Sequence, residues 1–314
     1  MALRVAFFGT PAFAVPTLEH LVHSPHAVVG VITQPDRARG RGQQISQAPV
    51  KALAAALALP ALQPERMSRD LFEASFTALR ADIGVVAAYG KILPDWLLAT
   101  PRLGLINVHA SLLPRYRGAS PVHRAVIGGD AETGVTIMRV VKALDAGPML
   151  SRVRVAIGDD DTTTVVESSL ARLGAELLMA TLDDIEHGRA IETAQDETQV
   201  TYAPKLTKAE GLVDWRRPAR DVHNLVRGLW PWPHASAFLD GTRFILHRSR
   251  LSAWSTGSPA GTILAASATD GLHVACGDGA IEILELQLEG KRLMNARDAM
   301  AGRLLTAGRR FSTP

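Results

Sequence analysis

Cysteine is almost absent from this sequence. Among its 314 residues, only Cys276 carries a thiol, which excludes an intramolecular disulfide framework and any metal site built from several cysteines. No spacing typical of a zinc finger is present either. A single thiol is compatible with a reducing environment, and we predict that the protein is cytoplasmic.

Long apolar runs are missing as well. No segment approaches the ~18 uninterrupted apolar residues that a membrane-spanning helix needs, so we expect no contact with a membrane. The apolar stretch MALRVAFFGTPAFAV is short, lacks the small-residue cleavage site of a secretory signal, and is broken up by Gly9, Pro11 and the following Pro16. This stretch predicts the first strand of a folded domain.

Several catalytic signatures cannot be found. There is no G-x-S-x-G elbow for a serine nucleophile and no H-E-x-x-H helix for zinc, which disfavours both chemistries, and we predict no metal. The first strand is followed by one glycine, Gly9, where a dinucleotide fingerprint needs three. A nicotinamide or flavin site is therefore disfavoured. Gly9 and Thr10 could turn backbone amides toward another ligand or form a purely structural turn.

The chain does contain a regular alternation of strand-like and helix-like segments. The runs LRVAFF, AVVGVIT, IGVVAA and GLINVH are nearly all apolar, as in parallel strands covered on both faces. Between them lie segments whose apolar residues recur at helical spacing. We predict an α/β domain with a doubly wound, mostly parallel sheet, to which GVTIMRV and MLSRVRVAI add antiparallel strands at one edge.

A second domain follows. The chain exceeds the usual size of a single domain, and its C-terminal third has short strand candidates separated by Asp-Gly and Gly-rich turns, typical of a small antiparallel barrel or sandwich. We predict a catalytic domain over residues 1–188, a polar, helix-poor linker over 189–206, and the second domain over 207–314.

The stretch INVHASLLPRYRG places two polar side chains at the end of an apolar strand. Because side chains alternate along a strand, Asn107 and His109 share one face, while Val108 points the other way, into the core. Both polar groups then lie at the carboxyl edge of the sheet, where such folds bind ligands. A lone histidine at this position would more often be a packing residue; the asparagine beside it favours a site.

A catalytic histidine needs a partner, usually a carboxylate, that fixes its tautomer and stabilises its charged form. Asp145 fits this role, because it lies in the loop LDAGPML between two predicted strands. The acidic residues 159–161 fit less well, because they precede a predicted helix and would cap it. We therefore predict that Asn107, His109 and Asp145 form a catalytic trio.

Positive charge is in excess over residues 207–314, with 14 Lys and Arg against 10 Asp and Glu, and a further local excess lies in one short segment. The whole chain has a net charge of only +3, but in QPDRARGRGQQISQAPVK the side chains of Arg37, Arg39, Arg41 and Lys51 are opposed by Asp36 alone. Such an excess can attract a polyanion, or it can be a solvated surface without a partner.

Longer motifs resemble those of the methionyl-tRNA formyltransferases along nearly the whole chain. The stretch INVHASLLPRYRGASPVHRAVIGGDAETGVTIM and the loop LDAGPML are specific to folate-dependent formyltransferases and hydrolases. The basic segment, TYAPKLTKAEGLVDW, PWPHA and LQLEGKRLM point to the tRNA enzymes. The resemblance implies a Rossmann-like catalytic domain followed by a smaller, OB-like β-barrel domain that assists tRNA binding.

The resemblance also implies roles for individual residues. The catalytic Asn, His and Asp of the family fall on Asn107, His109 and Asp145. The residues expected to contact the co-substrate 10-formyltetrahydrofolate are Ser111, Leu112, Leu113, Pro114, Tyr89, Gly90 and Ile92. The residues expected to contact the tRNA are Arg37, Arg39 and Arg41.

These roles imply one reaction. The free α-amino group of initiator methionyl-tRNA attacks the formyl carbon of 10-formyltetrahydrofolate, and the trio stabilises the tetrahedral intermediate and manages its protons. We expect a monomer.

This chain departs from the family pattern at three positions. It has Gln43 and Gln44 where lysines are common in relatives, which lowers the positive charge of the basic segment. It also has His234 where a small residue is usual.

Other functions stay open at this stage. A formyltransferase of the same fold could act on another amine, such as a UDP-amino-sugar. A glycinamide ribonucleotide formyltransferase fits less well because it would lack the barrel. A noncatalytic tRNA- or nucleotide-binding module fits least, because it would not need three converging polar side chains.

Overall fold

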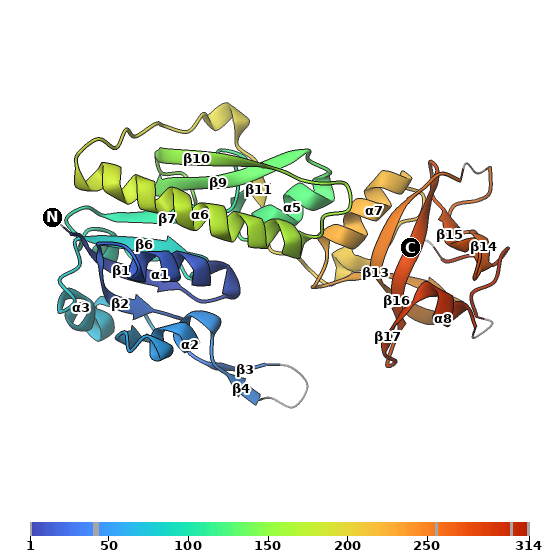
Figure 1. The fold of residues 1–314 in the computed structure, drawn as a ribbon, viewed down its shortest axis with the longest axis horizontal. Coiled ribbons are helices and arrows are strands. Elements are labelled where there is room, and N and C mark those ends of the chain that lie inside the picture. The colour runs from blue at the N-terminus through green and yellow to red at the C-terminus, as the bar shows by residue number, and fades with distance from the viewer. Residues whose placement is uncertain (1, 40–43, 255–256, 302–303, 313–314) are drawn as a thin grey trace. The chain divides into compact units, whose positions relative to one another are not determined.

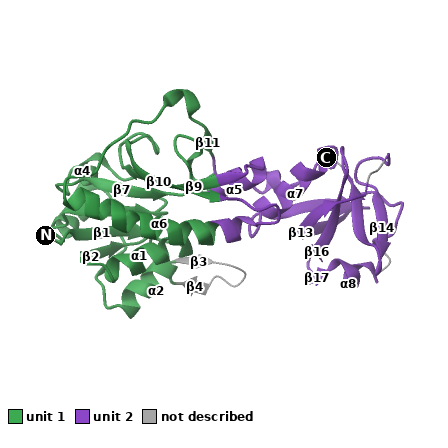
Figure 2. Ribbon diagram, turned by 45° about the horizontal axis from the view of Figure 1, so that its top comes forward, with its two compact units in different colours: residues 1–121, 133–155, 167–203 green, residues 122–132, 156–166, 204–314 purple. Residues whose placement is uncertain are grey.

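The computed structural model describes residues 2–39, 44–254, 257–301 and 304–312. The chain divides into two compact units (Figure 2). Unit 1 comprises residues 1–121, 133–155 and 167–203, and unit 2 comprises residues 122–132, 156–166 and 204–314. The polar segment 189–206, predicted as a linker, is divided between them after residue 203.

A seven-stranded sheet forms the centre of unit 1 (Figure 1). In spatial order its strands are β10 (Met149–Ala156), β9 (Glu132–Arg139), β7 (Leu105–His109), β6 (Ile83–Ala87), β1 (Arg4–Gly9), β2 (Ala27–Ile32) and β5 (Ala61–Leu62). The five strands from β7 to β5 are parallel, and β9 is antiparallel to β7. This arrangement confirms the predicted mostly parallel sheet with an antiparallel addition at one edge.

Helices connect the strands. Their bounds are α1 (Val15–Val22), α2 (Pro49–Ala56), α3 (Arg69–Thr77), α4 (Asp95–Leu98), α5 (Pro121–Gly128) and α6 (Thr163–Glu186), with a 3-10 turn η1 (Ala12–Ala14) before α1. Phe72 and Phe76 of α3 pack against Phe8 of β1 and Trp96 of α4. This aromatic cluster is part of the core of unit 1, and it packs α3 and α4 against the central sheet.

Two short strand pairs lie outside the main sheet. β3 (Arg37–Arg39) and β4 (Gln44–Ser46) form an antiparallel hairpin from the basic segment. Arg41, Gln43 and the other residues at 40–43 lie outside the described residues. β8 (Arg117–Gly118) pairs in parallel with β11 (Tyr202–Ala203), which follows the 3-10 turn η2 (Glu197–Gln199). The β8–β11 pair joins segments that the sequence pattern did not predict to meet.

Unit 2 contains an antiparallel sheet, as predicted. Its strands are β12 (Ala235–Leu239), β13 (Thr242–Ser252), β16 (Ala280–Leu288), β15 (Gly271–Ala275) and β14 (Ile263–Ser267) in spatial order, with β17 (Leu293–Asn295) pairing with β16. The other elements are η3 (Ala209–Gly211), α7 (Ala219–Gly228) and α8 (Ala296–Met300). The prediction of a Rossmann-like domain followed by a smaller, OB-like β-barrel domain is confirmed in its sheets, because a mostly parallel sheet is followed by an antiparallel one.

The chain near residue 311 connects both edges of this second sheet. The amide of Ser312 donates to the carbonyl of Phe238 in β12, and the amide of Ile263 in β14 donates to the carbonyl of Arg309. Phe311 is fully buried and stacks on Trp215 with 5.4 Å between ring centroids. The core of unit 2 therefore includes residues close to the end of the described chain.

Cys276 lies in the same core and is 4% exposed. Burial raises the pKa of its thiol to about 12, so the thiolate is scarce at neutral pH.

Among the described residues, no helix has both the length and the apolar character needed to cross a membrane.

His223 of α7 is a buried titratable group in unit 2. Its Nε2 donates to the Asp159 carbonyl, and its Nδ1 accepts from the Ser249 hydroxyl, both at 2.9 Å. Burial is the largest cause that lowers the pKa of His223 below its usual 6.5, and the nearby Arg227 adds to the effect, whereas the Asp159 carbonyl and Asp160 oppose it. The folded protein therefore holds this ring neutral where the unfolded chain would protonate it.

We predict that this group makes stability fall as the pH is lowered below about 6.5. The unfolded chain then binds the proton first, so acid favours unfolding by up to about 1.4 kcal/mol per pH unit for one group. His223→Gln should reduce that slope between pH 7 and pH 5, measured as the free energy of unfolding in guanidinium chloride. His187→Gln, at an exposed histidine, is the control, and equal slopes for wild type and both variants would contradict the prediction.

Candidate active site

Polar residues follow the carboxyl ends of three adjacent strands in unit 1. Thr10 follows β1, Tyr89 lies just after β6, and His109 ends β7. The chain moves from β1 toward β2 but returns on the other side of β1 to form β6. In open α/β sheets, ligands bind at the carboxyl edge where the strand order reverses in this way.

Asn107 and His109 project from the same face of β7. Val108 between them points to the opposite face, where a Cβ added at Gly174 of α6 would lie 2.9 Å from the Val108 Cγ1; the glycine thus allows the helix to approach the sheet closely. His109 is 5% exposed and Asn107 is half-buried. Within the described part of the chain, the Asn107 side-chain amide has no hydrogen-bond partner, which leaves its donors available.

His109 and Asp145 face each other. The distance from His109 Nδ1 to Asp145 Oδ2 is 3.7 Å, and the other ring nitrogen, Nε2, lies 3.0 Å from the Tyr116 carbonyl oxygen. The Asp145 carboxylate also accepts a hydrogen bond of 2.8 Å from the Gly118 amide. Both ring nitrogens therefore face oxygen atoms, the carboxylate of Asp145 on one side and the Tyr116 carbonyl on the other.

The segment after His109 is internally hydrogen-bonded. The Ser111 hydroxyl donates to the Arg115 carbonyl at 2.7 Å, and Thr136 Oγ1 donates to the Ser111 carbonyl while accepting from the Leu113 amide. Ser111, Leu113 and Pro114 are buried, and Leu112 is half-buried. With its hydroxyl hydrogen engaged by a main-chain carbonyl, Ser111 is poorly placed to act as a nucleophile.

The loop after β6 carries the other residues predicted to bind folate. The Tyr89 side chain is buried against Phe8, with 5.6 Å between ring centroids, and burial raises the pKa of Tyr89 to about 12. Gly90 and Ile92 are exposed, Ile92 at 89%. Tyr89 therefore anchors the loop in the core, and the next residues face outward.

A chain of hydrogen bonds connects this loop to the base of the β3–β4 hairpin. Gln34 Nε2 donates to the Tyr89 carbonyl at 2.7 Å, and Gln63 Nε2 donates to both the Gln34 carbonyl and the Asp36 carboxylate. Asp36 also forms an ion pair with Lys51, and the hydrogen bond from Lys51 is the main cause that lowers the Asp36 pKa. The base of the basic hairpin is thus held beside the predicted folate loop.

Two buried polar residues near Asp145 were not predicted from the sequence. Arg117 is 3% exposed and Gln195 is 9% exposed, and they hydrogen-bond to each other. An arginine in a basic turn and a glutamine in a polar stretch carry no sequence signal of burial. Their role becomes visible only in the folded structure, where the two side chains contact each other.

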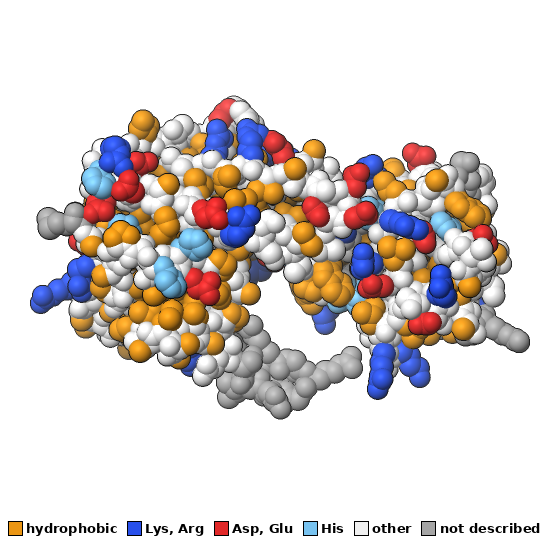
Figure 3. Space-filling model, in the orientation of Figure 1, with side chains coloured by type: hydrophobic (Ala, Val, Ile, Leu, Met, Phe, Trp, Pro, Cys, Tyr) orange, Lys and Arg blue, Asp and Glu red, His pale blue; other side chains and the backbone are white. Residues whose placement is uncertain are grey.

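The opposite edge of the sheet carries a histidine-rich cavity of about 830 Å³, lined by His20, His23, His26, Asp183, Glu186 and neighbouring residues. His26 immediately precedes β2, so the cavity lies at the amino ends of the strands. Several histidines are visible on the side of unit 1 that Figure 3 shows. The sequence did not predict this grouping, because α1 and the end of α6 are far apart along the chain.

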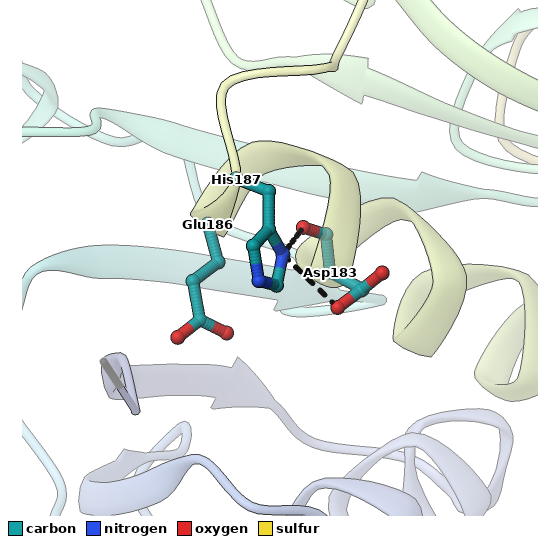
Figure 4. Close-up of side chains that lie close together, drawn as sticks. All are labelled: Asp183, Glu186 and His187. Atoms are coloured by element: carbon teal, nitrogen blue, oxygen red, sulfur yellow. Dashed lines mark hydrogen bonds and ion pairs between the residues drawn. The ribbon is translucent and has the colours of Figure 1, made fainter.

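In the described residues, the spacing of a metal site is found at Asp183, Glu186 and His187, at the end of α6 (Figure 4). The Asp183 carboxylate already lies 2.5 Å from the Arg189 guanidinium and 3.2 Å from His187 Nδ1. The same Nδ1 lies 2.8 Å from the Asp183 carbonyl. Ion pairs and a hydrogen bond at a helix end account for this group.

Family models and known relatives match nearly the whole chain. The family model described as formyl transferase matches residues 3–182, and the model of the formyl transferase C-terminal domain matches residues 205–304. A methionyl-tRNA formyltransferase from Methylococcus capsulatus is 46% identical over 311 residues, which cover 99% of this chain and 100% of the relative. The chain belongs to the methionyl-tRNA formyltransferase family.

Other members of the methionyl-tRNA formyltransferase family and more distant structures are consistent with this. The enzyme from Paracoccus denitrificans is 47% identical over 303 residues, or 96% of this chain and 98% of the relative. An N-formyltransferase from Helicobacter canadensis, in complex with folinic acid and dTDP-3-aminofucose, has a TM-score of 0.69 at 16% identity, covering 90% of this chain and 98% of that one. The latter comparison shows the fold alone.

Proposed function

We propose that this chain transfers the formyl group of 10-formyltetrahydrofolate to the α-amino group of initiator methionyl-tRNA. Membership of the methionyl-tRNA formyltransferase family supports the substrates. The observation that carries the chemistry is the pairing of His109 with Asp145 beside an Asn107 amide without a hydrogen-bond partner among the described residues. No serine nucleophile or metal is needed for this reaction.

The proposed reaction is a direct attack. The lone pair of the α-amine forms a C–N bond to the formyl carbon, and the carbonyl electrons move onto the oxygen of the tetrahedral intermediate. When this collapses, the bond to the folate N10 breaks, one proton has left the attacking nitrogen and one has reached N10. The reaction therefore needs donors for a transient oxyanion and a group that moves a proton.

Three side chains supply these needs in the proposal. The Asn107 amide donates to the oxyanion, and removing one such donor commonly lowers the rate by ~10²–10³-fold. His109 Nε2 gives up its contact with the Tyr116 carbonyl, contacts the substrate instead, and transfers the proton from the attacking nitrogen to the folate N10. Asp145 stabilises the charged imidazole, because opposite charges a few ångströms apart in a buried site interact strongly.

Folate and tRNA would approach from the same edge of unit 1. We propose that Ser111, Leu112, Leu113 and Pro114 form one side of the folate site and that Tyr89, Gly90 and Ile92 form the other. The tRNA contacts would come from Arg37 and Arg39 of the β3–β4 hairpin, from Arg41, which lies outside the described residues, and from the C-terminal domain.

One assay tests the function. Purified protein is incubated with 10-formyltetrahydrofolate and either charged initiator methionyl-tRNA or a nucleotide-linked amino sugar, and formyl transfer is measured. We expect transfer to the tRNA alone. Transfer to the sugar alone would replace this proposal with the alternative of a sugar formyltransferase.

The basic hairpin should control tRNA binding and not folate binding. Replacing Arg37, Arg39 and Arg41 with glutamine should raise the KM for methionyl-tRNA about 10-fold or more and leave the KM for folate unchanged. Each lost phosphate contact should also reduce the slope of log affinity against log salt by about 0.7–0.9. Filter binding at several salt concentrations measures that slope.

A control with the same change in charge is available on other elements. Arg69, Arg102 and Arg172 are exposed and form ion pairs with neighbouring carboxylates. Replacing these three with glutamine should leave tRNA binding nearly unchanged. An equal loss in both triple variants would indicate a general effect of net charge and argue against a specific hairpin contact.

A further inference from the structure

The loop that carries Asp145 is held by a side chain from a distant part of the chain. Gln195 Nε2 donates to the main-chain carbonyls of Asp145 and Gly147, each at 2.8 Å. A primary amide has two N–H groups, so both are used on this loop. Gln195 is buried and lies between α6 and β11 in unit 1.

The other end of the same amide is fixed as well. Gln195 Oε1 accepts from Nε and Nη2 of Arg117, at 3.0 and 2.8 Å. Arg117 is buried, and it also forms an ion pair of 2.7 Å with Glu197, whose side chain is 70% exposed, and a hydrogen bond with the Tyr202 side chain. The Gln195 amide oxygen therefore faces donors and its nitrogen faces acceptors. An amide flipped to exchange its oxygen and nitrogen would lose all of these hydrogen bonds, so the orientation is fixed.

The segments that carry Arg117 and Gln195 make further contacts with the Asp145 loop and the strand after it. Gly118, whose amide donates to Asp145 Oδ2, directly follows Arg117 in β8. Thr193, two residues before Gln195, exchanges two hydrogen bonds of 2.8 Å with Met149 at the start of β10. The loop is thus fixed by residues 117–118 at its side chain and by residues 193–195 at its backbone.

The position of Asp145 is one that needs such support. Its φ of +47° lies in the left-handed region that residues with a Cβ rarely adopt. Its Oδ2 lies 3.7 Å from His109 Nδ1, slightly beyond a hydrogen bond, so a small displacement of the loop would change that contact substantially. Without a donor, the part-buried carbonyl of Asp145 and the buried carbonyl of Gly147 would also favour rearrangement of the loop.

We propose that Gln195 is a positioning residue for formyl transfer, which holds Asp145 in place against His109. The inference rests on the function proposed above. Gln195 acts through the two carbonyls of the Asp145 loop and touches neither substrate. Its loss should therefore reduce turnover and leave substrate binding intact.

The variant Gln195→Glu tests the hydrogen bonds that Gln195 donates, because it removes the donors and keeps the size of the side chain. A carboxylate has nearly the same size and can still accept from Arg117, but it has no N–H for the two carbonyls and would repel them. Because a misplacement of about 1 Å at a reacting group can cost ~10²-fold, we expect kcat to fall by about 10- to 100-fold. The KM values for 10-formyltetrahydrofolate and methionyl-tRNA should change less than threefold.

Glu197→Gln is the matched control. It removes the negative charge opposite Arg117 and leaves the bonds of Gln195 in place, so kcat should stay within threefold of wild type. If Gln195→Glu were as active as wild type, or if it raised KM and left kcat unchanged, the proposal would be overturned. Wild type assayed in parallel separates the two proposals, since its failure to formylate tRNA would refute the function itself.

Gln195→Met provides a second variant of similar size with no donor. The melting temperature and tetrahydrofolate binding are measured for both variants. A folded Gln195→Met with low kcat and normal tetrahydrofolate affinity would support the proposal. Loss of the cooperative melting transition in both variants would assign Gln195 to the stability of the fold and overturn it.

Discussion

Replacing His109 with glutamine should lower kcat by about 10²–10⁴-fold, the usual contribution of a positioned acid–base group. Glutamine can still donate to the Tyr116 carbonyl, which His109 Nε2 contacts at 3.0 Å, so the local fold should be retained. It cannot take up a proton, so it cannot form an ion pair with Asp145. The expected result is a folded protein that binds both substrates and turns over very slowly.

Single-turnover formyl transfer at saturating substrate measures this loss directly. His20→Gln is the control, because His20 also contacts a main-chain carbonyl, that of Pro16, but lies on α1 beside the cavity at the opposite edge of the sheet. Its kcat should equal that of wild type. A His109→Gln variant with near-normal turnover would remove His109 from the proposed chemistry.

Gly147→Ala should reduce kcat by about 100-fold and destabilise the protein by about 1–3 kcal/mol, typical of overpacking in a core. A Cβ at Gly147 would lie 1.9 Å from the Arg139 carbonyl oxygen. This neighbour is backbone in β9 and cannot rotate away. The loop would have to shift, and Asp145 lies two residues away on it.

Activity and the free energy of unfolding are both needed to test this prediction. Gly257→Ala is the matched control, because a Cβ there has nothing within 4 Å and the backbone φ is not positive. It should leave both quantities unchanged. If Gly147→Ala retained full activity, the position of the Asp145 loop would be less critical than the geometry indicates.

The sequence predicted the parts of the site that depend on local pattern. The alternation of side chains along a strand places Asn107 and His109 on one face, and the near-continuous apolar runs predict the parallel sheet that brings this face to its carboxyl edge. The loop containing Asp145 was predicted because glycine and proline interrupt two strand patterns. In the structure, His109 and Asp145 lie 3.7 Å apart.

What the sequence could not predict depends on contacts between distant segments. Arg117 stands in a basic turn and is nevertheless buried, because Gln195 and Glu197 reach it from residues that show no helix or strand pattern. The strands β8 and β11 have two residues each, too few for any periodicity. The histidines around the cavity at the amino ends of the strands likewise come together only in the folded chain.

The residues near position 311 have a consequence for work with fragments of this protein. They are hydrogen-bonded to β12 on one side and to the start of β14 on the other, whereas the match to the C-terminal family model ends at residue 304. A fragment cut at that boundary would leave unpaired backbone groups along both strands. Exposed strand edges pair readily with other chains, so such a fragment would tend to self-associate and precipitate during purification.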